Sequence, residues 1–355
     1  MTIAGARPNF VKVAPLIAAF NRLDPAPGHI LVHTGQHYDH QMSRVFFEEL
    51  DMPDPDEYLG VGSGSHAVQT AAILLAFEPV LLKHQPNWVI VVGDVNSTLA
   101  CALVCAKLGV PVAHVEAGLR SGDRTMPEEI NRLLTDQIAD LLFTPSPDGN
   151  ANLRREGIPA EKIHFVGNVM IDTLVRLLPR AQARPILTEL GLPPGGYLLV
   201  TLHRPANVDQ PGPLGEILSA LQNLSQQLPI IFPVHPRTRE RMQHFGLSAP
   251  GVRFLEPLGY LDFLALTQAA GLVLTDSGGI QEETTYLGVP CLTARPSTER
   301  PVTLASGNRL VASQRQAILD AVAQARAAPR SSARIPALWD GHTAERIAAI
   351  LHEQR

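Results

Sequence analysis

Acidic side chains follow two apolar segments in the first half of the chain, near the point where each segment ends. Asp94 comes shortly after Val89–Val92, and Glu116 comes directly after Val112–Val115. Taken alone, Asp94 has the position of a helix N-cap. If the two apolar segments are neighbouring parallel strands, however, the two carboxylates lie side by side, and their repulsion favours keeping a proton on one of them. Such a pair is typical of general acid–base chemistry.

A third acid, Glu128, stands in the segment Pro127-Glu-Glu-Ile-Asn-Arg132, which has the pattern of a helix start. Acidic residues are common in the first turn of a helix because they interact favourably with its dipole. Glu128 is therefore weak evidence by itself.

Two cations accompany the start of an earlier predicted helix. Arg7 precedes the helical run Phe10–Phe20, and Lys12 lies in its first turn. A helix N-terminus with cations beside it is a ready site for an anion. A solvated pair of charges would have the same pattern, so these residues alone leave both interpretations open.

In the second half of the chain, His203 and Arg204 directly follow the predicted strand Tyr197–Thr201. Most histidines at such positions fill a core, but a strand end beside arginine and proline is not typical of a core. His235 repeats this arrangement one strand later. Ligands of open parallel sheets bind beyond the carboxyl ends of the strands, so we expect these side chains at a binding site.

The segment Leu274-Thr-Asp-Ser-Gly-Gly-Ile-Gln-Glu-Glu-Thr284 predicts a phosphate site at a helix start. Ser277, Gly278 and Gly279 present backbone N–H groups there, as Rossmann-type folds do for phosphates. Glu283, one turn inside the helix, is placed to accept hydrogen bonds from ribose hydroxyls. The motif is neither G-x-G-x-x-G nor G-K-[ST], which excludes a dinucleotide fingerprint and an NTP-hydrolysing P-loop.

The elements that must position these residues alternate between short apolar strands and helices, which predicts parallel sheets covered on both faces. The predicted strands are Thr2–Ala4, Val89–Val92, Val112–Val115, Leu141–Thr144, His164–Val166, Tyr197–Thr201, Ile230–Val234, Leu272–Thr275 and Pro290–Thr293. The predicted helices are Phe10–Phe20, Ser97–Leu108, Ile171–Gln182, Leu214–Gln227, Leu261–Ala270, Gly279–Leu287 and Thr343–Gln354.

The alternation restarts in the second half, and 355 residues suit two domains better than one. The sequence therefore predicts an α/β protein of two Rossmann-like, doubly wound parallel-sheet domains. We place the hinge near Gly167, with an N-terminal domain over residues 1–167 and a C-terminal domain over residues 168–341.

Net charge, cysteine content and apolar segments indicate which partners and which compartment to expect. The formal net charge is -5, which gives no general attraction toward nucleic acid or an anionic membrane, so we expect neither as a partner.

Cys101, Cys105 and Cys291 do not make a disulfide framework. The first two are four residues apart in an apolar run and are better explained as small buried side chains than as metal ligands. Neither a signal peptide nor an apolar run of bilayer length is found, so we expect the cytoplasm.

These segments together resemble a known family. The motifs GARPNFVKVAPL, GQHYDHQM, GDVNSTLA, HVEAGLRSGD, PEEINR, GNVMIDTL, LHRPANVD, TDSGGIQEE and STERP occur in the order seen in the non-hydrolysing UDP-N-acetylglucosamine 2-epimerases. The match runs from about residue 5 to about residue 310. The resemblance implies the two-domain GT-B type of fold, with both domains facing a central cleft, and a last helix, residues 342–355, that packs back on the first domain.

The resemblance also implies an activity, the reversible conversion of UDP-GlcNAc to UDP-ManNAc without metal or cofactor. UDP is eliminated across C1–C2 to give 2-acetamidoglucal and is then added back with the proton on the other face, which needs proton-transfer groups on both faces of C2. By resemblance, the catalytic candidates are Asp94, Glu116, Glu128 and His203. The resemblance further implies a homodimer, a UDP-binding second domain and a set of substrate-binding residues, namely Arg7, Lys12, Arg132, His203, Phe263, Ser277, Gly278, Gly279 and Glu283.

Alternatives remain at this level. A hydrolysing epimerase that releases UDP and ManNAc would share the fold and the carboxylates. An epimerase of a diacetamido-uronic acid nucleotide would need an extra cation near C6. A GT-B glycosyltransferase would need an acceptor groove and would tolerate loss of Glu116 or Glu128 better. A pure nucleotide-binding module does not explain three carboxylates at the strand ends.

Overall fold

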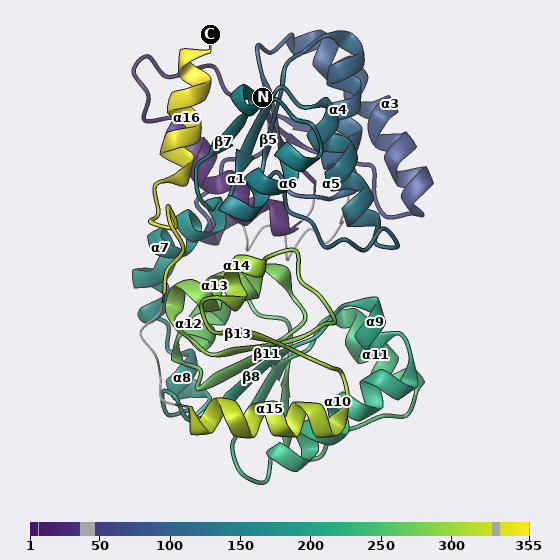
Figure 1. Ribbon diagram of the computed structural model, residues 1–355, viewed down its shortest axis with the longest axis vertical. Coiled ribbons are helices and arrows are strands. Elements are labelled where there is room, and N and C mark those ends of the chain that lie inside the picture. The colour runs from purple at the N-terminus through teal and green to yellow at the C-terminus, as the bar shows by residue number, and fades with distance from the viewer. Residues whose placement is uncertain (6, 36–46, 329–333, 355) are drawn as a thin grey trace. The chain divides into compact units, whose positions relative to one another are not determined.

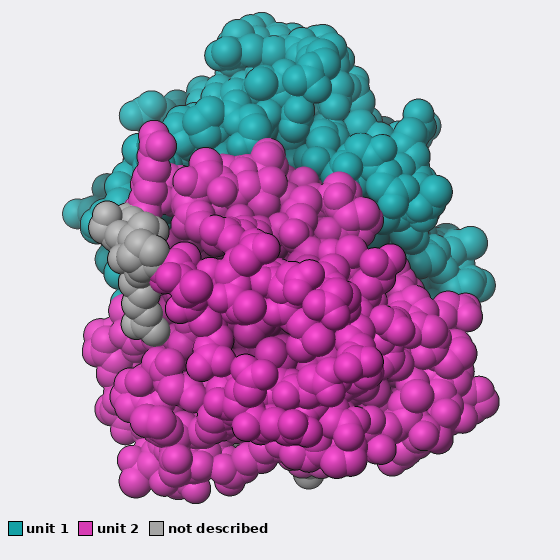
Figure 2. All heavy atoms as spheres, turned by 60° about the horizontal axis from the view of Figure 1, so that its bottom comes forward, with its two compact units in different colours: residues 1–176, 337–355 teal, residues 177–336 magenta. Residues whose placement is uncertain are grey.

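The computed structural model describes residues 1–5, 7–35, 47–328 and 334–354. Most of the motif GQHYDHQM therefore lies outside the described residues. The chain divides into two compact units, coloured separately in Figure 2. Unit 1 comprises Met1–Arg176 and Ala337–Arg355, and unit 2 comprises Leu177–Pro336.

Unit 1 contains a sheet of seven parallel strands. In chain order these are β1 (Thr2–Ala4), β2 (Leu31–His33), β3 (Glu57–Tyr58), β4 (Val89–Val92), β5 (Val112–Val115), β6 (Leu141–Thr144) and β7 (Ile163–Phe165). Their order in the sheet is β3-β2-β1-β4-β5-β6-β7. Strands β4, β5 and β6 are buried along their whole length, as the continuous apolar runs predict for a sheet covered on both faces.

The helices of unit 1 cover this sheet. They are α1 (Arg7–Phe20), α3 (His66–His84), α4 (Asn96–Leu108), α5 (Pro127–Ile138), α6 (Pro147–Arg155), the first part of α7 (Val169–Gln182) and α16 (Thr343–Glu353), with a short 3-10 helix at Ala160–Lys162. Helix α7 continues into unit 2 after Arg176. Figure 1 shows α1 and α16 together at one side of unit 1 and α3, α4 and α5 at the other. The core beneath them includes Val91, Cys101 and Cys105, and burial raises the pKa of the Cys105 thiol to about 12.

Unit 2 repeats the plan with six parallel strands in the order β10-β9-β8-β11-β12-β13. The strands are β8 (Leu198–Thr201), β9 (Ile230–Pro233), β10 (Val252–Leu255), β11 (Leu272–Thr275), β12 (Cys291–Ala294) and β13 (Asn308–Val311). The helices are α8 (Ile186–Glu189), α9 (Pro205–Val208), α10 (Pro211–Leu224), α11 (Pro236–His244), α12 (Tyr260–Ala269), α13 (Gly278–Leu287), α14 (Pro301–Leu304) and α15 (Arg315–Ala327). The predicted fold class, two doubly wound parallel-sheet domains, is confirmed.

The strand order reverses once in each sheet, between β1 and β4 in unit 1 and between β8 and β11 in unit 2. Helices that follow the two strands at such a point leave on opposite faces of the sheet, so a crevice opens beyond the carboxyl ends of that pair. The polar strand ends that the sequence singles out, after Ala4, Val92, Thr201 and Thr275, are the ends of these two strand pairs. The fold therefore brings candidate residues from distant parts of each half to one place.

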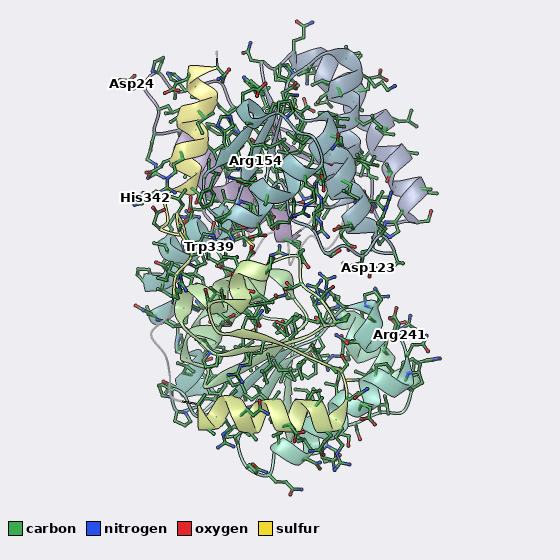
Figure 3. All side chains as sticks on the ribbon, in the orientation of Figure 1. Asp24, Asp123, Arg154, Arg241, Trp339 and His342 are labelled. Atoms are coloured by element: carbon green, nitrogen blue, oxygen red, sulfur yellow. The ribbon has the colours of Figure 1, made fainter. Side chains whose placement is uncertain are left out.

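The C-terminal helix α16 belongs to unit 1. The first two N–H groups of α16 donate hydrogen bonds to the two carboxylate oxygens of Asp172 on α7, Thr343 N at 3.1 Å and Ala344 N at 2.6 Å. Burial raises the pKa of Asp172 to about 6. Trp339, labelled in Figure 3 beside His342 in the segment that enters α16, is buried and donates from its indole to Pro145 O at 2.8 Å. The chain thus returns to unit 1 through specific polar contacts.

Helix α3 differs from the expectation that no apolar run would be long enough to cross a membrane. Within the described part of the chain, this one helix is long and apolar enough to do so by length and composition. It buries Ile73, Phe77 and Leu81 in the core of unit 1, and its N-cap Ser65 accepts a hydrogen bond from Val68 N. These contacts are those of a covering helix in a doubly wound fold.

Candidate active site

In unit 1, the side chain of Asn9 joins the ends of β1 and β4, the two strands between which the strand order reverses. Asn9 Oδ1 accepts from Gly5 N at 3.0 Å, just after β1, and Nδ2 donates to Val92 O at 3.2 Å, at the end of β4. Arg7 precedes it in α1, but the Arg7 side chain lies outside the described residues, so its predicted contact with a diphosphate stays a prediction.

Glu116 lies one residue beyond β5 with a backbone φ of 73°, in the left-handed region that only glycine adopts freely. Its N–H and that of Ala117 both donate to Phe143 O at the end of β6, which holds the turn in place. The buried carboxylate forms an ion pair with Lys12 of α1, which is itself 6% exposed. Strained backbone held by surrounding bonds is common at functional sites, and it fixes the direction of this carboxylate.

Asp94 lies two residues beyond β4 and is not the N-cap of the following helix, because α4 begins at Asn96 with Val95 as its N-cap. The isolated N-cap interpretation was therefore wrong. The Asp94 carboxylate is half-buried and pairs with Arg132 of α5, while Asn131 Nδ2 donates to Asp94 O at 2.9 Å. Helix α5 thus holds both the side chain and the backbone of Asp94.

Arg132 is only 2% exposed, because two carboxylates occupy its guanidinium. Besides Asp94, it meets Glu129 Oε2, to which its Nη2 donates at 2.8 Å. Burial raises the pKa of Glu129, but the N–H of Ser121 and the charge of Arg132 outweigh that effect and lower it. Arg132 therefore orients Asp94, and its predicted contact with the substrate stays a prediction.

The two strands that carry Asp94 and Glu116 at their ends are neighbours in the sheet, as the sequence suggests. Strands β4 and β5 pair in register with Val92 opposite Val115. A Cβ placed on Gly93, the residue before Asp94, would lie 3.4 Å from Glu116 Oε2. Glu128 stands on α5 at the spacing of three and four residues before Asn131 and Arg132, and hence on the helix face that meets Asp94. Its side chain is half-buried and makes neither a hydrogen bond nor an ion pair to another described residue.

Behind Glu116 lies a fully buried histidine–aspartate pair that the sequence did not single out. His114 Nδ1 lies 2.6 Å from Asp136 Oδ1, and His114 Nε2 lies 2.8 Å from Gly93 O. Asp136 also accepts from Gly118 N at 3.1 Å and meets Arg120 Nη2 at 2.7 Å. These bonds tie the turn that carries Glu116 to the turn that carries Asp94.

In unit 2, the start of α13 has the geometry of an anion site. Ser277 is the N-cap residue, yet its hydroxyl makes no capping hydrogen bond. Within the part of the chain that the structure describes, no hydrogen bond is made by the N–H groups of Gly278 and Gly279. A helix N-terminus with unused N–H groups attracts phosphate oxygens.

Arginines surround this helix start. A Cβ on Gly278 would contact the guanidinium of Arg300 and lie 2.8 Å from Glu299 Oε1, so a side chain there would displace this ion pair. Glu299 is buried and pairs with Arg300, with Arg295 at 2.6 Å and with Arg204 at 3.6 Å. Burial raises the pKa of Glu299, but these guanidinium groups outweigh it and hold the pKa far below its usual range. The sequence assigned no role to Arg295, Glu299 or Arg300, although the motif STERP, which follows a strand end, was a signal for them.

Glu283 lies one turn into α13 and is 3% exposed. Its Oε1 accepts from the hydroxyl of Tyr260 on α12 at 2.9 Å. Burial raises the pKa of Glu283 to about 7, against the opposing effect of that hydrogen bond. Phe263 stands three residues after Tyr260 on α12, hence on the same helix face, and is half-buried. A carboxylate and a partly exposed aromatic ring from two adjoining helices suit a ribose and a flat base.

His203 follows β8 and is held by Asp276, the residue after β11. Asp276 is fully buried and accepts from His203 N (3.1 Å), Arg204 N (2.9 Å) and Asn207 Nδ2 (3.0 Å), while His203 Nδ1 lies 3.0 Å from its Oδ1. Burial raises the pKa of Asp276, but the bonds from His203, Asn207 and Arg204 lower it below its usual value. Asp276 belongs to the TDSGG motif, yet no role was predicted for it.

The structure therefore gathers the predicted residues into two sets, one within each unit. In unit 1 the strand ends carry Asp94 and Glu116, with Lys12 on α1 and Glu128 on α5. In unit 2 they carry His203 and the start of α13, with Glu283 and Phe263 nearby. Among the described residues, no three His, Cys, Asp or Glu side chains are placed to hold a metal ion.

Comparison with known proteins gives the family of the chain. A family model described as UDP-N-acetylglucosamine 2-epimerase matches residues 21–352. The UDP-N-acetylglucosamine 2-epimerase of Methanocaldococcus jannaschii is 45% identical over 332 residues, which are 90% of this chain and 90% of that protein. A UDP-2,3-diacetamido-2,3-dideoxy-D-glucuronate 2-epimerase of Pseudomonas aeruginosa is 44% identical over 325 residues, again 90% of each. The crystal structure of the M. jannaschii UDP-GlcNAc 2-epimerase in complex with UDP-GlcNAc and UDP matches with a TM-score of 0.92 and 42% identity, over 99% of both chains.

Proposed function

Because the chain belongs to the UDP-N-acetylglucosamine 2-epimerase family, we propose that it interconverts UDP-GlcNAc and UDP-ManNAc by eliminating UDP and adding it back, without hydrolysis. The observation that carries this proposal is the pair Asp94 and Glu116, two carboxylates at the ends of adjacent strands, each beside a buried cation. A binding protein for UDP-sugars has no use for such a pair.

The chemistry explains why carboxylates are needed. The proton on C2 has no neighbouring carbonyl, so its simple removal is very costly. In an elimination, a base takes that proton while the C1–O bond breaks, its electron pair leaves with UDP, and a C1–C2 double bond forms in 2-acetamidoglucal. Re-addition reverses each change, with the proton delivered to the other face of C2. Two proton-transfer groups are therefore required.

We assign Asp94, Glu116 and Glu128 of unit 1 to this proton transfer. Arg132 keeps the Asp94 carboxylate in a fixed direction, and Lys12 does the same for Glu116. Lys12 and Arg132 also remain proposed contacts of the substrate. Fixed directions matter because a small misplacement of a catalytic group costs orders of magnitude in rate.

We assign the grip on UDP to unit 2. Ser277, Gly278 and Gly279 would bind the diphosphate through the start of α13, together with His203. Arg7 remains a proposed contact of the diphosphate. Glu283 would accept from the ribose hydroxyls, and Phe263 would pack against uracil. The M. jannaschii relative, which was crystallised with UDP-GlcNAc and UDP, supports a ligand of this class.

One experiment tests the activity. The purified protein is incubated with UDP-GlcNAc in D2O, and C2 is followed by NMR. We expect deuterium at C2, formation of UDP-ManNAc and no net release of UDP. Free UDP together with ManNAc would instead establish a hydrolysing enzyme, and no exchange at all would refute epimerisation of this substrate.

A second substrate deserves the same assay, because the relative from P. aeruginosa that acts on a UDP-diacetamido-glucuronate is 44% identical, nearly as similar as the M. jannaschii enzyme. Its substrate carries a carboxylate at C6 in place of a hydroxymethyl group. Exchange at C2 of that nucleotide, with none in UDP-GlcNAc, would transfer the proposal to the uronic acid substrate.

We also propose a homodimer, with α3 in the interface. Val68, Leu75 and Leu82 are 65%, 76% and 56% exposed and stand seven residues apart, the spacing at which apolar side chains form a seam between paired helices. An apolar hollow adjoins them, lined in part by Ala67, Ala71, Leu74 and Ile130. Light scattering is expected to give a dimer for the wild type and a monomer for Leu75→Glu. Leu310→Glu, which changes an exposed leucine of unit 2, is the matched control and should stay dimeric.

A further inference from the structure

The two units each contain a histidine–aspartate pair, and the pairs differ in one respect. His114 in unit 1 is fully buried, and both of its ring nitrogens are occupied, Nδ1 by Asp136 and Nε2 by Gly93 O. His203 in unit 2 uses Nδ1 for Asp276, while Nε2 makes no hydrogen bond to a described residue and the side chain is 42% exposed. The His114 ring therefore has no nitrogen left for a ligand, whereas Nε2 of His203 can bind one.

Asp276 can act only as an acceptor toward this ring. It is buried, and its oxygens already receive N–H bonds from His203, Arg204 and Asn207, which are bonds to an ionised carboxylate. His203 Nδ1 therefore carries the hydrogen that lies between ring and carboxylate. A buried carboxylate behind a histidine fixes the orientation of the ring and supports a positive charge on it.

His203 and the anion site at the start of α13 lie at the carboxyl ends of two neighbouring strands. Strands β8 and β11 pair in register with Thr201 opposite Thr275. His203 and Ser277 each lie two residues beyond the end of these strands, at the carboxyl ends of the pair where the strand order reverses. An anion bound by the N–H groups of α13 is therefore bound beside His203.

Two further charged or titratable side chains of unit 2, among the residues that the structure describes, adjoin this ring. Arg204 follows it in the chain and is tied to Asp276 O and Glu299. His235, at the end of β9, has its ring centroid 5.9 Å from that of His203, and its Nδ1 accepts from Arg237 N. Of these groups, Asp276 alone is a carboxylate in contact with the ring.

We propose that Asp276 is a positioning residue that holds His203 as a doubly protonated ring, with Nε2–H directed at the diphosphate of the leaving UDP. This inference rests on the proposed function for its ligand. Charge builds up on the diphosphate as the C1–O bond breaks, so a fixed cationic donor there stabilises the transition state more than the bound substrate. Asp276 contributes to this stabilisation only through His203 and does not contact the substrate.

The first test reads the ring directly in the wild-type protein. With 15N-labelled histidine and saturating UDP at pH 7.5, we expect the His203 signal, assigned by its loss in His203→Gln, to show both nitrogens protonated. A singly protonated ring in the UDP complex would overturn the proposal, whether or not any variant folds.

The second test is a double-mutant cycle on UDP affinity, measured by calorimetry. Asp276→Asn keeps the size of the side chain and should weaken UDP binding about 10- to 100-fold, the value of a charge-assisted hydrogen bond. The same change in a His203→Ala background should have almost no further effect, because Asp276 acts through His203. Equal losses in both backgrounds would mean that Asp276 merely supports the loop.

Asn207→Ala is the matched control, since it removes another hydrogen bond from the same carboxylate but leaves the ring contact intact. It should weaken UDP binding much less than Asp276→Asn and leave the His203 signal doubly protonated. Both tests use UDP without turnover. A failure of the C2 exchange assay would thus leave them interpretable, and their own failure would leave the proposed epimerisation standing.

Discussion

Replacing Glu283 by glutamine is expected to make the protein more stable at neutral and alkaline pH. Glu283 is buried in α13 with the Tyr260 hydroxyl as its hydrogen-bond donor. Glutamine has the same shape and keeps an oxygen to accept that bond, but it never becomes charged. The variant therefore isolates the free energy of ionising this carboxyl inside unit 2.

The sign and size follow from the raised pKa. Burial lifts the pKa of Glu283 from 4.5 to about 7. Below pH 4.5 both the folded and the unfolded chain hold the proton, so glutamate costs nothing. Between pH 4.5 and 7 the unfolded chain releases the proton while the folded chain keeps it, so the free energy of unfolding falls as the pH rises. Above pH 7 the loss is complete, and a difference of roughly 2.5 pH units corresponds to about 3 kcal/mol.

The assay is urea unfolding of the ligand-free wild type and of Glu283→Gln at several values between pH 4.5 and pH 8. We expect the two to have similar stability at pH 4.5, and the variant to lead by about 3 kcal/mol at pH 8. Glu189→Gln, at an exposed position of the same unit, is the control and should follow the wild type throughout. Parallel curves for the wild type and Glu283→Gln would refute the reasoning, because the carboxyl would then ionise alike in both states.

Three further predictions concern catalysis, binding and the C-terminal helix. Asp94→Asn should abolish deuterium exchange at C2 yet leave UDP affinity within about twofold; a fully active variant would remove Asp94 from the mechanism. Gly278→Ala should weaken UDP binding about tenfold or more, because the new methyl group meets Arg300, while Gly212→Ala, where a Cβ meets nothing within 4 Å, should bind UDP normally in the same titration. Asp172→Ala should lower the free energy of unfolding by about 1 to 2 kcal/mol and speed amide exchange at the start of α16, since it removes both capping bonds; unchanged exchange there would contradict that role.

Much of the fold could be predicted because fully buried parallel strands are continuous apolar runs. Val89–Val92, Val112–Val115, Leu141–Thr144 and Leu272–Thr275 appear in the structure with the predicted bounds. Strands β3, β10 and β13 were not predicted, because each exposes part of its length at or near a sheet edge and so lacks such a run. Strand β2 is buried and three residues long, and it was not predicted either.

The candidate site could be predicted only as a list of strand ends. Asp94, Glu116 and His203 were found because polar residues after buried strands are unusual. Arg132 shows where that reasoning stops. The resemblance implied a ligand contact for it, and the structure adds its two carboxylate partners, Asp94 and Glu129, which no local pattern indicated. A sequence gives the charge of a side chain but not the charges that it meets.

The sequence alone determined the alternation of strands and helices, the restart that makes two units, and the strand ends where chemistry could occur. These depend on local patterns of burial and turn residues. Only the tertiary structure decided the partners: Lys12 with Glu116, Arg132 with Asp94, and Asp276 with His203. Those pairs join residues from different strands and helices. They arise because the strand order in each sheet reverses between the first and fourth strands, which places distant segments side by side.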